Sequence, residues 1–343
     1  MKTALLHYWL TNVRGGEKVL AALANMFPSA DVFTHAYRPE CMNGMFAGHK
    51  VTESFIARLP FGRRHPQAYL PLMPSAARSL DLSGYDLVIS SESGPIKGIR
   101  KSSGARHVCY CHTPMRYVWD MYDDYYRMSG IGGKLAMKLF TGHMRKADLK
   151  SAESVDEFVA NSKFVASRIK RIYGREAKVV YPPVDLDFFS VPHLSRKSGF
   201  YLFVGSSVKY KRFDLAQAAC RKMGRRLIAV GGINVLSDLD LRTLYACADA
   251  LLFPGLEDFG ITPVEAQAAG TPVIAFGAGG ALETVVPGKT GVFFGQQTVD
   301  ALCEAIEVFE EYSWDSKVCR ANASRFSPEA FRRGMSDVLG VPA

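Results

Sequence analysis

Short apolar runs alternate with amphipathic helical stretches along almost the whole chain, and this alternation restricts the fold more than any other feature. The first run covers residues 4–10, and similar runs recur up to residues 178–181. Pro182 and Pro183 then interrupt the pattern, which starts again at residues 201–205. Alternating strands and helices are typical of parallel sheets covered by helices. The sequence therefore predicts an α/β protein with two doubly wound, Rossmann-like domains.

The length of the chain and the position of the two prolines predict the domain boundaries. A chain of 343 residues is long for one hydrophobic core. We expect an N-terminal domain over residues 1–187, a C-terminal domain over residues 188–325, and a helical end over residues 326–343 that packs back towards the N-terminal domain. Residues 190–198 are polar and predict a linker. Doubly wound sheets bind ligands beyond the carboxyl ends of their strands, so we expect the two domains to face a central cleft.

Composition limits the compartment and the partners. The chain has 42 basic and 33 acidic residues, a net charge of +9, which suits phosphates, nucleotides, an anionic membrane or nucleic acid. No recognisable nucleic-acid module is present, so nucleic acid is not an expected partner. The seven cysteines lack a C-x-x-C pair, which favours free thiols in a reducing compartment. No signal peptide and no membrane-spanning run is apparent, so we expect a cytoplasmic protein.

Residues 250–265 carry two carboxylates around a predicted strand-to-helix turn. The apolar run 250–253 breaks at Pro254, and we expect a helix to start at Thr262. Glu257 lies in the turn and Glu265 in the first turn of the helix, where such sheets bind ligands. Thr262 and Glu265 also fit a capping box, in which Glu265 would close its own helix and bind nothing.

Two features of the N-terminal half are also candidates for ligand binding. Gly15 and Gly16 precede a predicted helix over residues 19–27, and paired glycines at a helix start let backbone N–H groups approach an anion. A tight turn without a ligand would look the same. His112 follows the predicted strand 106–111 and would point into the cleft as a proton carrier or hydrogen-bond partner. A structural role is the alternative for His112, and we assign a structural role to His7 and His107.

Three further stretches each allow both a structural and a functional interpretation. Residues 56–82 are basic and broken by prolines, which fits a solvated face or a docking surface for an anionic acceptor or membrane. Residues 115–128 are aromatic and acidic, which fits carbohydrate contact or a packed helix. Residues 134–150 form a basic amphipathic helix that could lie on an anionic membrane or belong to a solvated bundle.

Four blocks together resemble the retaining GT-B glycosyltransferases of family 4. They are the Glu257–Glu265 window, with seven residues between the glutamates, and the blocks 14–18, 109–117 and 181–185. The resemblance covers nearly the whole chain. The last three blocks look most like a branch that includes mannosyltransferases, which use GDP-mannose to build O-antigen lipopolysaccharide and exopolysaccharide units on a polyprenyl diphosphate carrier.

The resemblance implies a role for individual residues. Glu257 would contact the donor sugar, Glu265 the ribose hydroxyls and Lys211 the diphosphate. Neither a metal nor another cofactor is implied, and the D-x-D pairs at 185–187 and 238–240 do not follow convincing buried strands. Retention without a carboxylate nucleophile implies front-face substitution, in which the departing phosphate takes the acceptor's proton. The implied catalytic residues are His112 and Glu257. The implied donor-binding residues are Gly16, Lys209, Lys211, Arg212, Asp258, Phe259, Gly260, Ile261 and Glu265. The implied acceptor-side residues are Arg14, Gly15, Glu17, Arg116 and Tyr117.

The chain departs from the family pattern at two places. Ser206 stands where an arginine beside the diphosphate is usual, and Lys209 could compensate although lysine lacks the bidentate geometry of arginine. Residues 231–238 lead almost directly into the next helix, so the second sheet is predicted to be one βα unit short. We expect a mannosyltransferase acting on a lipid-linked saccharide, peripheral at the inner face of the cytoplasmic membrane. The alternative is a catalytically weakened homologue that binds a glycan or a partner protein.

Overall fold

The computed structural model describes residues 1–191, 198–206, 208–231 and 236–342. The chain forms two compact units. Unit 1 contains Met1–Tyr181 and Arg332–Ala343, and unit 2 contains Pro182–Phe331. The expected boundary at residue 187 is therefore six residues too late, and the boundary at the terminal helix is also displaced by six residues. Most of the expected linker, residues 192–197, lies outside the described residues.

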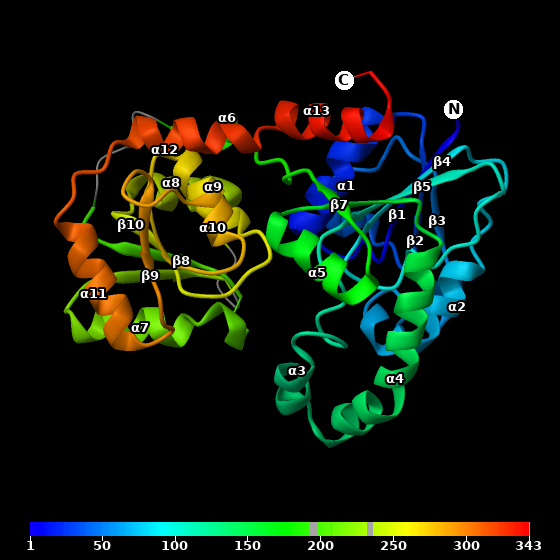
Figure 1. The fold of residues 1–343 in the computed structure, drawn as a ribbon, viewed down its shortest axis with the longest axis horizontal. Helices are drawn as coiled ribbons and strands as arrows, with labels where there is room; N and C mark the ends of the chain where they lie inside the picture. The colour runs from blue at the N-terminus through cyan, green and yellow to red at the C-terminus, as the bar shows by residue number, and fades with distance from the viewer. Residues whose placement is uncertain (192–197, 207, 232–235, 343) are drawn as a thin grey trace. The chain divides into compact units, whose positions relative to one another are not determined.

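Unit 1 is built on a parallel seven-stranded sheet with the order β3-β2-β1-β4-β5-β6-β7 (Figure 1). Its strands are β1 (Thr3–His7), β2 (Asp31–Thr34), β3 (Val51–Glu53), β4 (Leu87–Glu92), β5 (Arg106–Cys111), β6 (Glu157–Ala160) and β7 (Ala177–Val179). The sequence analysis missed β3, a three-residue edge strand whose side chains are only half-buried. The strand order reverses between β1 and β4, and a ligand is expected beyond the carboxyl ends of strands at such a point.

The helices of unit 1 cover the sheet and extend beyond it. They are α1 (Gly15–Met26), α2 (Met73–Arg78), α3 (Tyr122–Met128), α4 (Ile131–Glu153) and α5 (Lys163–Tyr173), with the 3-10 turns η1 (Pro39–Cys41), η2 (Phe55–Arg58) and η3 (Pro66–Leu72). The C-terminal half of α4 packs with α5 against β5 and β6 through Ala152, Ile169 and Phe158. In Figure 1, α3 and the first half of α4 form a hairpin that extends away from the sheet.

Unit 2 is built on a parallel five-stranded sheet with the order β12-β11-β10-β8-β9. Its strands are β8 (Tyr201–Val204), β9 (Leu227–Val230), β10 (Ala250–Phe253), β11 (Val273–Phe276) and β12 (Gly291–Phe294). Its helices are α6 (Leu186–Phe189), η5 (Lys209–Lys211), α7 (Phe213–Lys222), α8 (Asp238–Cys247), α9 (Ile261–Ala268), α10 (Ala281–Thr284), α11 (Val299–Glu310), α12 (Ser316–Ala323) and η6 (Ser324–Phe326). Among the described residues β9 is an edge strand, and this sheet has two strands fewer than that of unit 1. This arrangement agrees with the prediction that the second sheet is one βα unit short.

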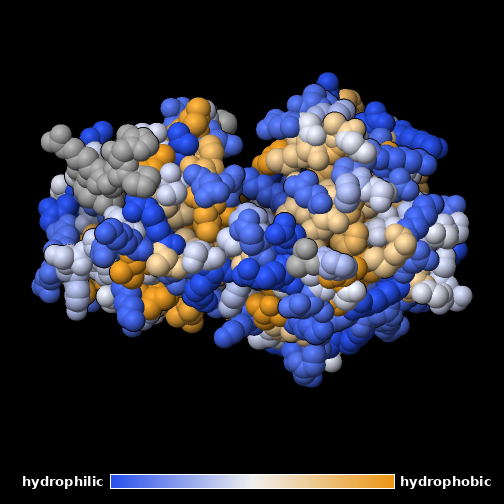
Figure 2. Space-filling view, turned by 90° about the horizontal axis from the view of Figure 1, so that it is seen from above, coloured by the Kyte–Doolittle hydropathy of each residue, from blue (hydrophilic) through white to orange (hydrophobic). Residues whose placement is uncertain are grey.

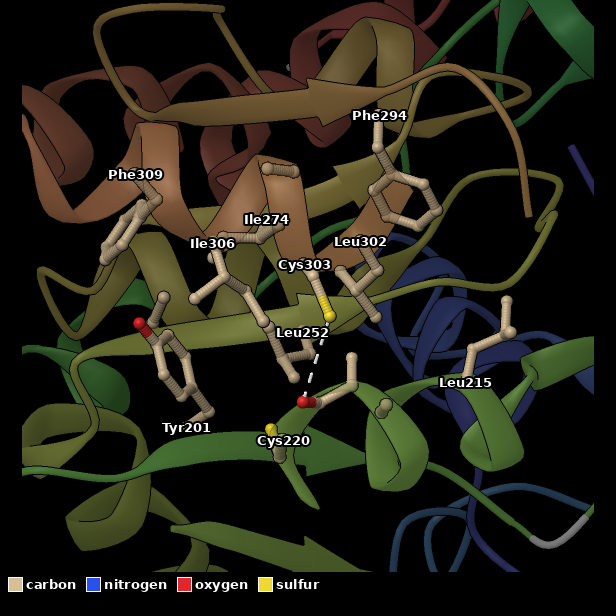
Figure 3. Packing of buried hydrophobic residues seen from close by; sticks show 14 of the residues in the cluster. Tyr201, Leu215, Cys220, Leu252, Ile274, Phe294, Leu302, Cys303, Ile306 and Phe309 are labelled. Carbon is tan, nitrogen blue, oxygen red and sulfur yellow. Dashed lines mark hydrogen bonds between the residues drawn. The ribbon is translucent and has the colours of Figure 1, made fainter. Parts of the chain in front are cut away.

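Two helices, α7 and α11, form the apolar core on one face of the second sheet (Figure 3). Leu215 and Cys220 of α7 face Leu302 and Ile306 of α11. This packing covers one face of the sheet.

The last helix, α13 (Pro328–Leu339), starts in unit 2 and ends in unit 1. Arg106 on β5 donates hydrogen bonds to the carbonyl oxygens of Val338 at 2.7 Å and Leu339 at 2.9 Å. Gly334 faces Val180, and a Cβ atom at Gly334 would lie 3.0 Å from the Val180 side chain. The end of α13 is therefore held on unit 1 by hydrogen bonds and close packing.

No described helix is both long and apolar enough to cross a bilayer. The face of the molecule in Figure 2 is mainly hydrophilic, with smaller apolar areas between the charged side chains.

A buried ionic network joins four segments of unit 1. The Lys97 ammonium lies 2.8 Å from Glu92 at the end of β4 and 2.5 Å from Asp148 on α4. Asp148 also accepts hydrogen bonds from Trp119 at 2.8 Å and Tyr173 at 2.9 Å. Burial acts to lower the pKa of Lys97, but the two carboxylates outweigh burial and hold the pKa well above its usual value. The network therefore contains a buried lysine that stays charged.

Lys97→Met tests how far this network supports the fold. The substitution leaves two buried carboxylates without their cation, and removal of one partner from a buried ionic group costs about 3–5 kcal/mol. We expect the free energy of unfolding in urea to fall by that amount. Lys101→Met is the control, because Lys101 pairs with the more exposed Asp156 and should cost less than about 1 kcal/mol. Equal losses in both variants would contradict a special role for the network.

Candidate functional site

The carboxyl ends of β1, β4 and β5 bring several polar side chains together in unit 1. His112 follows β5, and its backbone N–H donates to the carbonyl oxygen of Glu92 at 2.8 Å. Its ring Nε2 lies 2.9 Å from the Ser91 hydroxyl on β4. The structure thus places His112 beyond a strand end beside the point where the strand order reverses, as the sequence analysis predicted.

Helix α1 begins at Gly15, four residues earlier than expected. The reason is Glu17, whose carboxylate accepts the Arg14 backbone N–H at 2.9 Å and carries a negative charge in the first turn. Glu17 is buried, and its acceptor-side role stays a prediction. The extra turn also makes Gly16 part of the helix N-terminus.

Gly16 brings this helix N-terminus against two imidazole rings. A Cβ atom on Gly16 would lie 3.3 Å from Cε1 of His7 and 3.5 Å from Nε2 of His112. The absence of a side chain therefore leaves the backbone of the first turn open beside His112. Backbone N–H groups at such a position favour an anion.

His7 is a member of this group that the sequence analysis assigned to a structural role. It is fully buried at the end of β1, and neither ring nitrogen has a hydrogen-bond partner. Its Nε2 lies 3.6 Å from the Glu17 carboxylate, beyond hydrogen-bond distance. The position of His7 as the last residue of the strand that leads into the glycine pair was the sequence signal that could have identified it.

The electrostatic environment keeps His112 neutral. Burial and the neighbouring His7 lower the pKa of His112 from 6.5 to about 3. Burial raises the pKa of Tyr8 to about 12; the Glu17 carboxylate adds to this rise, and the charges of Arg14 and Arg116 oppose it. At neutral pH His112 is therefore a hydrogen-bonding group, and it is too weak a base to hold an abstracted proton.

The predicted acceptor-side residues divide into two groups. The charges of Arg14 and Arg116 both oppose the rise in the pKa of Tyr8. Tyr117 instead packs with Met115 and Val118, and its hydroxyl donates to the Met115 sulfur at 3.0 Å. The Tyr117 ring thus belongs to the packing of unit 1.

Unit 2 carries the second group of candidate residues, in the loops after β8 and β10. Lys211 follows β8 in η5, Glu257 follows β10, and their charged groups lie 2.6 Å apart. The strand order also reverses between β8 and β10, so this ion pair lies at the expected ligand position of the second sheet. Gly255 makes the approach possible, because a Cβ atom there would lie 2.8 Å from Cα of Lys211.

The structure corrects the start of the next helix. Helix α9 begins at Ile261 after Gly260, which has a positive φ of 79° and lies so close to Phe253 that a Cβ atom would be 2.8 Å from its ring. Thr262 lies inside the first turn and is not the N-cap, so the predicted capping box does not form. Its hydroxyl oxygen is buried without a hydrogen-bond partner. This hydroxyl is a second polar group that the sequence analysis missed as a possible ligand contact.

Glu265 is bound by a side chain from another helix. Its side chain is buried, and one carboxylate oxygen accepts a hydrogen bond from the Tyr245 hydroxyl of α8 at 2.8 Å. Burial and the carboxylate raise the pKa of Tyr245 well above its usual value, which keeps the hydroxyl a donor. A tyrosine from α8 thus orients Glu265.

The remaining predicted donor residues differ in exposure. Asp258 and Phe259 are buried, and the Phe259 ring packs on Phe326 at 5.5 Å between centroids, so Phe259 offers a ligand only its backbone. Lys209 is exposed. Arg212 has a left-handed backbone (φ 54°), which is strained for a residue with a side chain, and its guanidinium contacts Asp214 and Gln297.

The two departures from the family pattern lie beside this group. Ser206 is exposed just after β8. Residues 232–235, in the shortened stretch, lie outside the described residues. Gly231 closely approaches the loop after β8, because a Cβ atom there would lie 2.2 Å from the Gly205 carbonyl oxygen.

The arrangement of two parallel Rossmann-like sheets defines the class as the GT-B glycosyltransferase fold, and comparisons with known proteins identify the family. The model of Glycosyltransferase Family 4 matches residues 13–188, more than half of the chain, and the model of Glycosyl transferases group 1 matches residues 228–326. The chain therefore belongs to Glycosyltransferase Family 4.

Individual relatives are distant. The D-inositol 3-phosphate glycosyltransferase of Mycobacterium tuberculosis is 28% identical over 196 residues, which cover 45% of this chain and 41% of the relative. The chain thus matches well under half the length of this curated relative. The structure of Anabaena Alr3699/HepE in complex with UDP and glucose has a TM-score of 0.70 at 16% identity, and covers 99% of this chain and 100% of its own. Sucrose-phosphate synthase (tll1590) from Thermosynechococcus elongatus has a TM-score of 0.71 at 16% identity, with 99% and 98% covered.

The low pKa values of buried histidines predict how stability depends on pH. Burial lowers the pKa of His35 and His107 to about 4, and burial together with His7 lowers that of His112 to about 3. Between about pH 6.5 and 4 the unfolded chain binds more protons than the folded chain, so stability is full above pH 6.5 and falls as the pH falls. Each histidine contributes up to about 1.4 kcal/mol per pH unit.

Urea unfolding at pH 7.0, 6.0 and 5.0 would measure this slope. We expect His112→Gln to reduce the slope, because glutamine keeps a polar group near Ser91 but does not titrate. His143→Gln, on the exposed surface of α4, is the control and should keep the slope of the parent protein. An unchanged slope in His112→Gln would show that folding does not lower the pKa of His112.

Proposed function

We propose that this protein transfers a sugar from a nucleotide-sugar donor to an acceptor with retention of the anomeric configuration. The observation that carries the proposal is the Lys211–Glu257 pair at the switch point of the second sheet, next to the start of α9. A cation and a helix N-terminus at one strand edge suit the diphosphate of a nucleotide sugar, and a carboxylate suits the hydroxyls of its sugar ring.

Donor binding would exchange the partners of this pair. A diphosphate has more negative charge than a carboxylate, so it would attract Lys211 away from Glu257. Glu257 would then be free to accept hydrogen bonds from sugar hydroxyls. The N–H groups at the start of α9 and the unpartnered Thr262 hydroxyl supply further donors to phosphate oxygens. Glu265, oriented by Tyr245, would accept from the ribose hydroxyls.

The family resemblance of the sequence blocks assigns residues of unit 1 to the same reaction. As the bond between the anomeric carbon and the phosphate oxygen breaks, negative charge grows on the diphosphate and positive charge on the sugar ring. Cations and helix N-termini stabilise the first charge, and the N-terminus of α1 at Gly15 and Gly16 is a candidate for part of that role. The acceptor oxygen forms the new bond on the same face while the departing phosphate oxygen takes its proton. Neutral His112 would hold a sugar hydroxyl.

The finer assignments rest on the family resemblance of the sequence blocks. We propose mannose from GDP-mannose as the donor and a polyprenyl-diphosphate-linked saccharide as the acceptor, at the cytoplasmic face of the membrane. One relative is a D-inositol 3-phosphate glycosyltransferase, and the similar fold of Anabaena Alr3699/HepE is seen in complexes with UDP and UDP-glucose. The test therefore includes several nucleotide classes.

Nucleotide binding is the first prediction of this proposal. One class among GDP-, UDP- and ADP-sugars should raise the thermal midpoint of the purified protein. When membrane lipid extract is added as the source of acceptor, the protein should release the nucleoside diphosphate from that donor. Lys211→Met should weaken nucleotide binding about tenfold or more, because it removes a charge-assisted phosphate contact. Lys222→Met, which removes an exposed lysine paired with Asp300, is the control. A folded protein that responds to no nucleotide would favour the catalytically weakened homologue instead.

Metal independence is a separate prediction. The described residues contain no group of three or more histidine, cysteine or acidic side chains that could hold a metal ion. We propose that Lys211 and the helix N-termini carry out the charge stabilisation, so treatment with EDTA should leave sugar transfer unchanged. Loss of transfer with EDTA and recovery with Mg²⁺ or Mn²⁺ would contradict this part of the proposal.

A further inference from the structure

The hairpin of α3 and α4 exposes apolar side chains that the rest of unit 1 does not cover. Ile131 is 91% exposed, Leu135 is 58% exposed and Leu139 is 65% exposed. They recur every four residues and therefore lie along one side of α4. Met128 at the end of α3 adds another exposed apolar side chain next to the start of this stripe.

Lysines accompany the apolar stripe along the same helix. Within residues 131–150, all of which the structure describes, Lys134, Lys138, Lys146 and Lys150 form no ion pair. The carboxylate in this stretch, Asp148, is buried in the network with Lys97. The exposed part of α4 therefore combines aliphatic side chains with uncompensated positive charge, and the exposed acids of the hairpin, Asp123 and Asp124, lie on the first turn of α3.

The hairpin is firmly attached to unit 1 although its tip is uncovered. Met144 packs with Met115 and Val118, and Asp148 holds the buried network. Arg145 donates to the Val118 carbonyl oxygen at 2.6 Å and stacks over Trp119. The second half of α4 is thus a buried base, and the first three turns extend from it (Figure 1).

We propose that this hairpin docks the protein on an anionic lipid bilayer, with Ile131, Leu135 and Leu139 entering the headgroup region and the lysines contacting lipid phosphates. Aliphatic side chains flanked by lysines on one helix are the combination that an anionic interface binds. A second copy of the chain is a poorer occupant, because two such faces would bring lysines against lysines. The proposal extends the proposed function by naming the element that would bring the protein to a membrane-bound acceptor.

The turn around Phe61 in unit 1 also combines an exposed apolar side chain with positive charge. Phe61 is 72% exposed and has a positive φ of 56°, which is strained for a phenylalanine. The exposed Arg58 and Arg64 flank it, and the turn is tight because a Cβ atom on Gly62 would lie 1.9 Å from the Ile56 carbonyl oxygen. The turn leads into η3, which contacts α4. We include Phe61 as a second apolar contact of the docking surface.

Flotation of the full-length protein with two kinds of vesicle tests the proposal. Vesicles of phosphatidylcholine with phosphatidylglycerol should bind the protein, binding should weaken in high salt, and vesicles of phosphatidylcholine alone should bind it far less. The double variant Leu135→Ser/Leu139→Ser should lower partitioning by about tenfold or more. Lys134→Gln/Lys138→Gln should lower it by about tenfold on anionic vesicles only.

Two further variants make the test specific. Val308→Ser/Val318→Ser removes exposed apolar side chains from α11 and α12, and should bind vesicles like the parent protein. Phe61→Gly should reduce binding while the thermal midpoint stays unchanged, since glycine adopts the left-handed backbone without strain. Vesicle binding that is equal in all variants would overturn the proposal.

The remaining outcomes separate this proposal from its rivals. If the parent protein sediments as a dimer that Leu135→Ser/Leu139→Ser dissociates, the surface is an interface between copies and the proposal is wrong. Nucleotide stabilisation should stay intact in the same variant. A protein that binds anionic vesicles through the hairpin but responds to no nucleotide would contradict the proposed function and leave the docking surface supported.

Discussion

The ion pair of Lys211 and Glu257 is the interaction on which the proposed chemistry depends. It joins the loops after β8 and β10 at 2.6 Å, and it keeps a cation and a carboxylate together at the strand edge of unit 2. The backbone at Gly255, in the loop after β10, lies close to the backbone of Lys211 in the loop after β8. A diphosphate can compete for Lys211 because it has the larger negative charge, and release of Glu257 then follows from the same event.

The candidate residues of unit 1 are neutral groups beside a helix N-terminus. Gly16 leaves the start of α1 open beside His112, and His7 lies beneath the same turn. Burial and His7 keep the His112 imidazole neutral, so it contributes hydrogen bonds and no charge. This division is consistent with front-face substitution, in which the departing phosphate, and not a side chain, takes the acceptor proton.

The buried network around Lys97 connects this region to the surface hairpin. Glu92, which contacts Lys97, also supplies the carbonyl oxygen that accepts the His112 backbone N–H. Asp148 of the same network anchors α4, whose first turns carry the exposed aliphatic stripe. A charged group inside unit 1 therefore positions both a candidate site residue and the base of the proposed docking surface.

The sequence by itself determined the class of fold, the break near Pro182, the shortened second sheet and the position of His112 after its strand. These features follow from local periodicity and from where a strand must end. Its resemblance to the family also predicted roles for Glu257, Glu265 and Lys211, but the sequence misplaced the start of α1 and the cap of α9. Tertiary structure decided those points. Glu17 reaches back to the Arg14 N–H, Gly260 has a backbone that allows an earlier helix start, and Tyr245 from another helix binds Glu265. Contacts between segments far apart in sequence, such as Gly16 with His7 and Lys211 with Glu257, also become visible only in the folded chain, because no local pattern encodes a distance across a sheet.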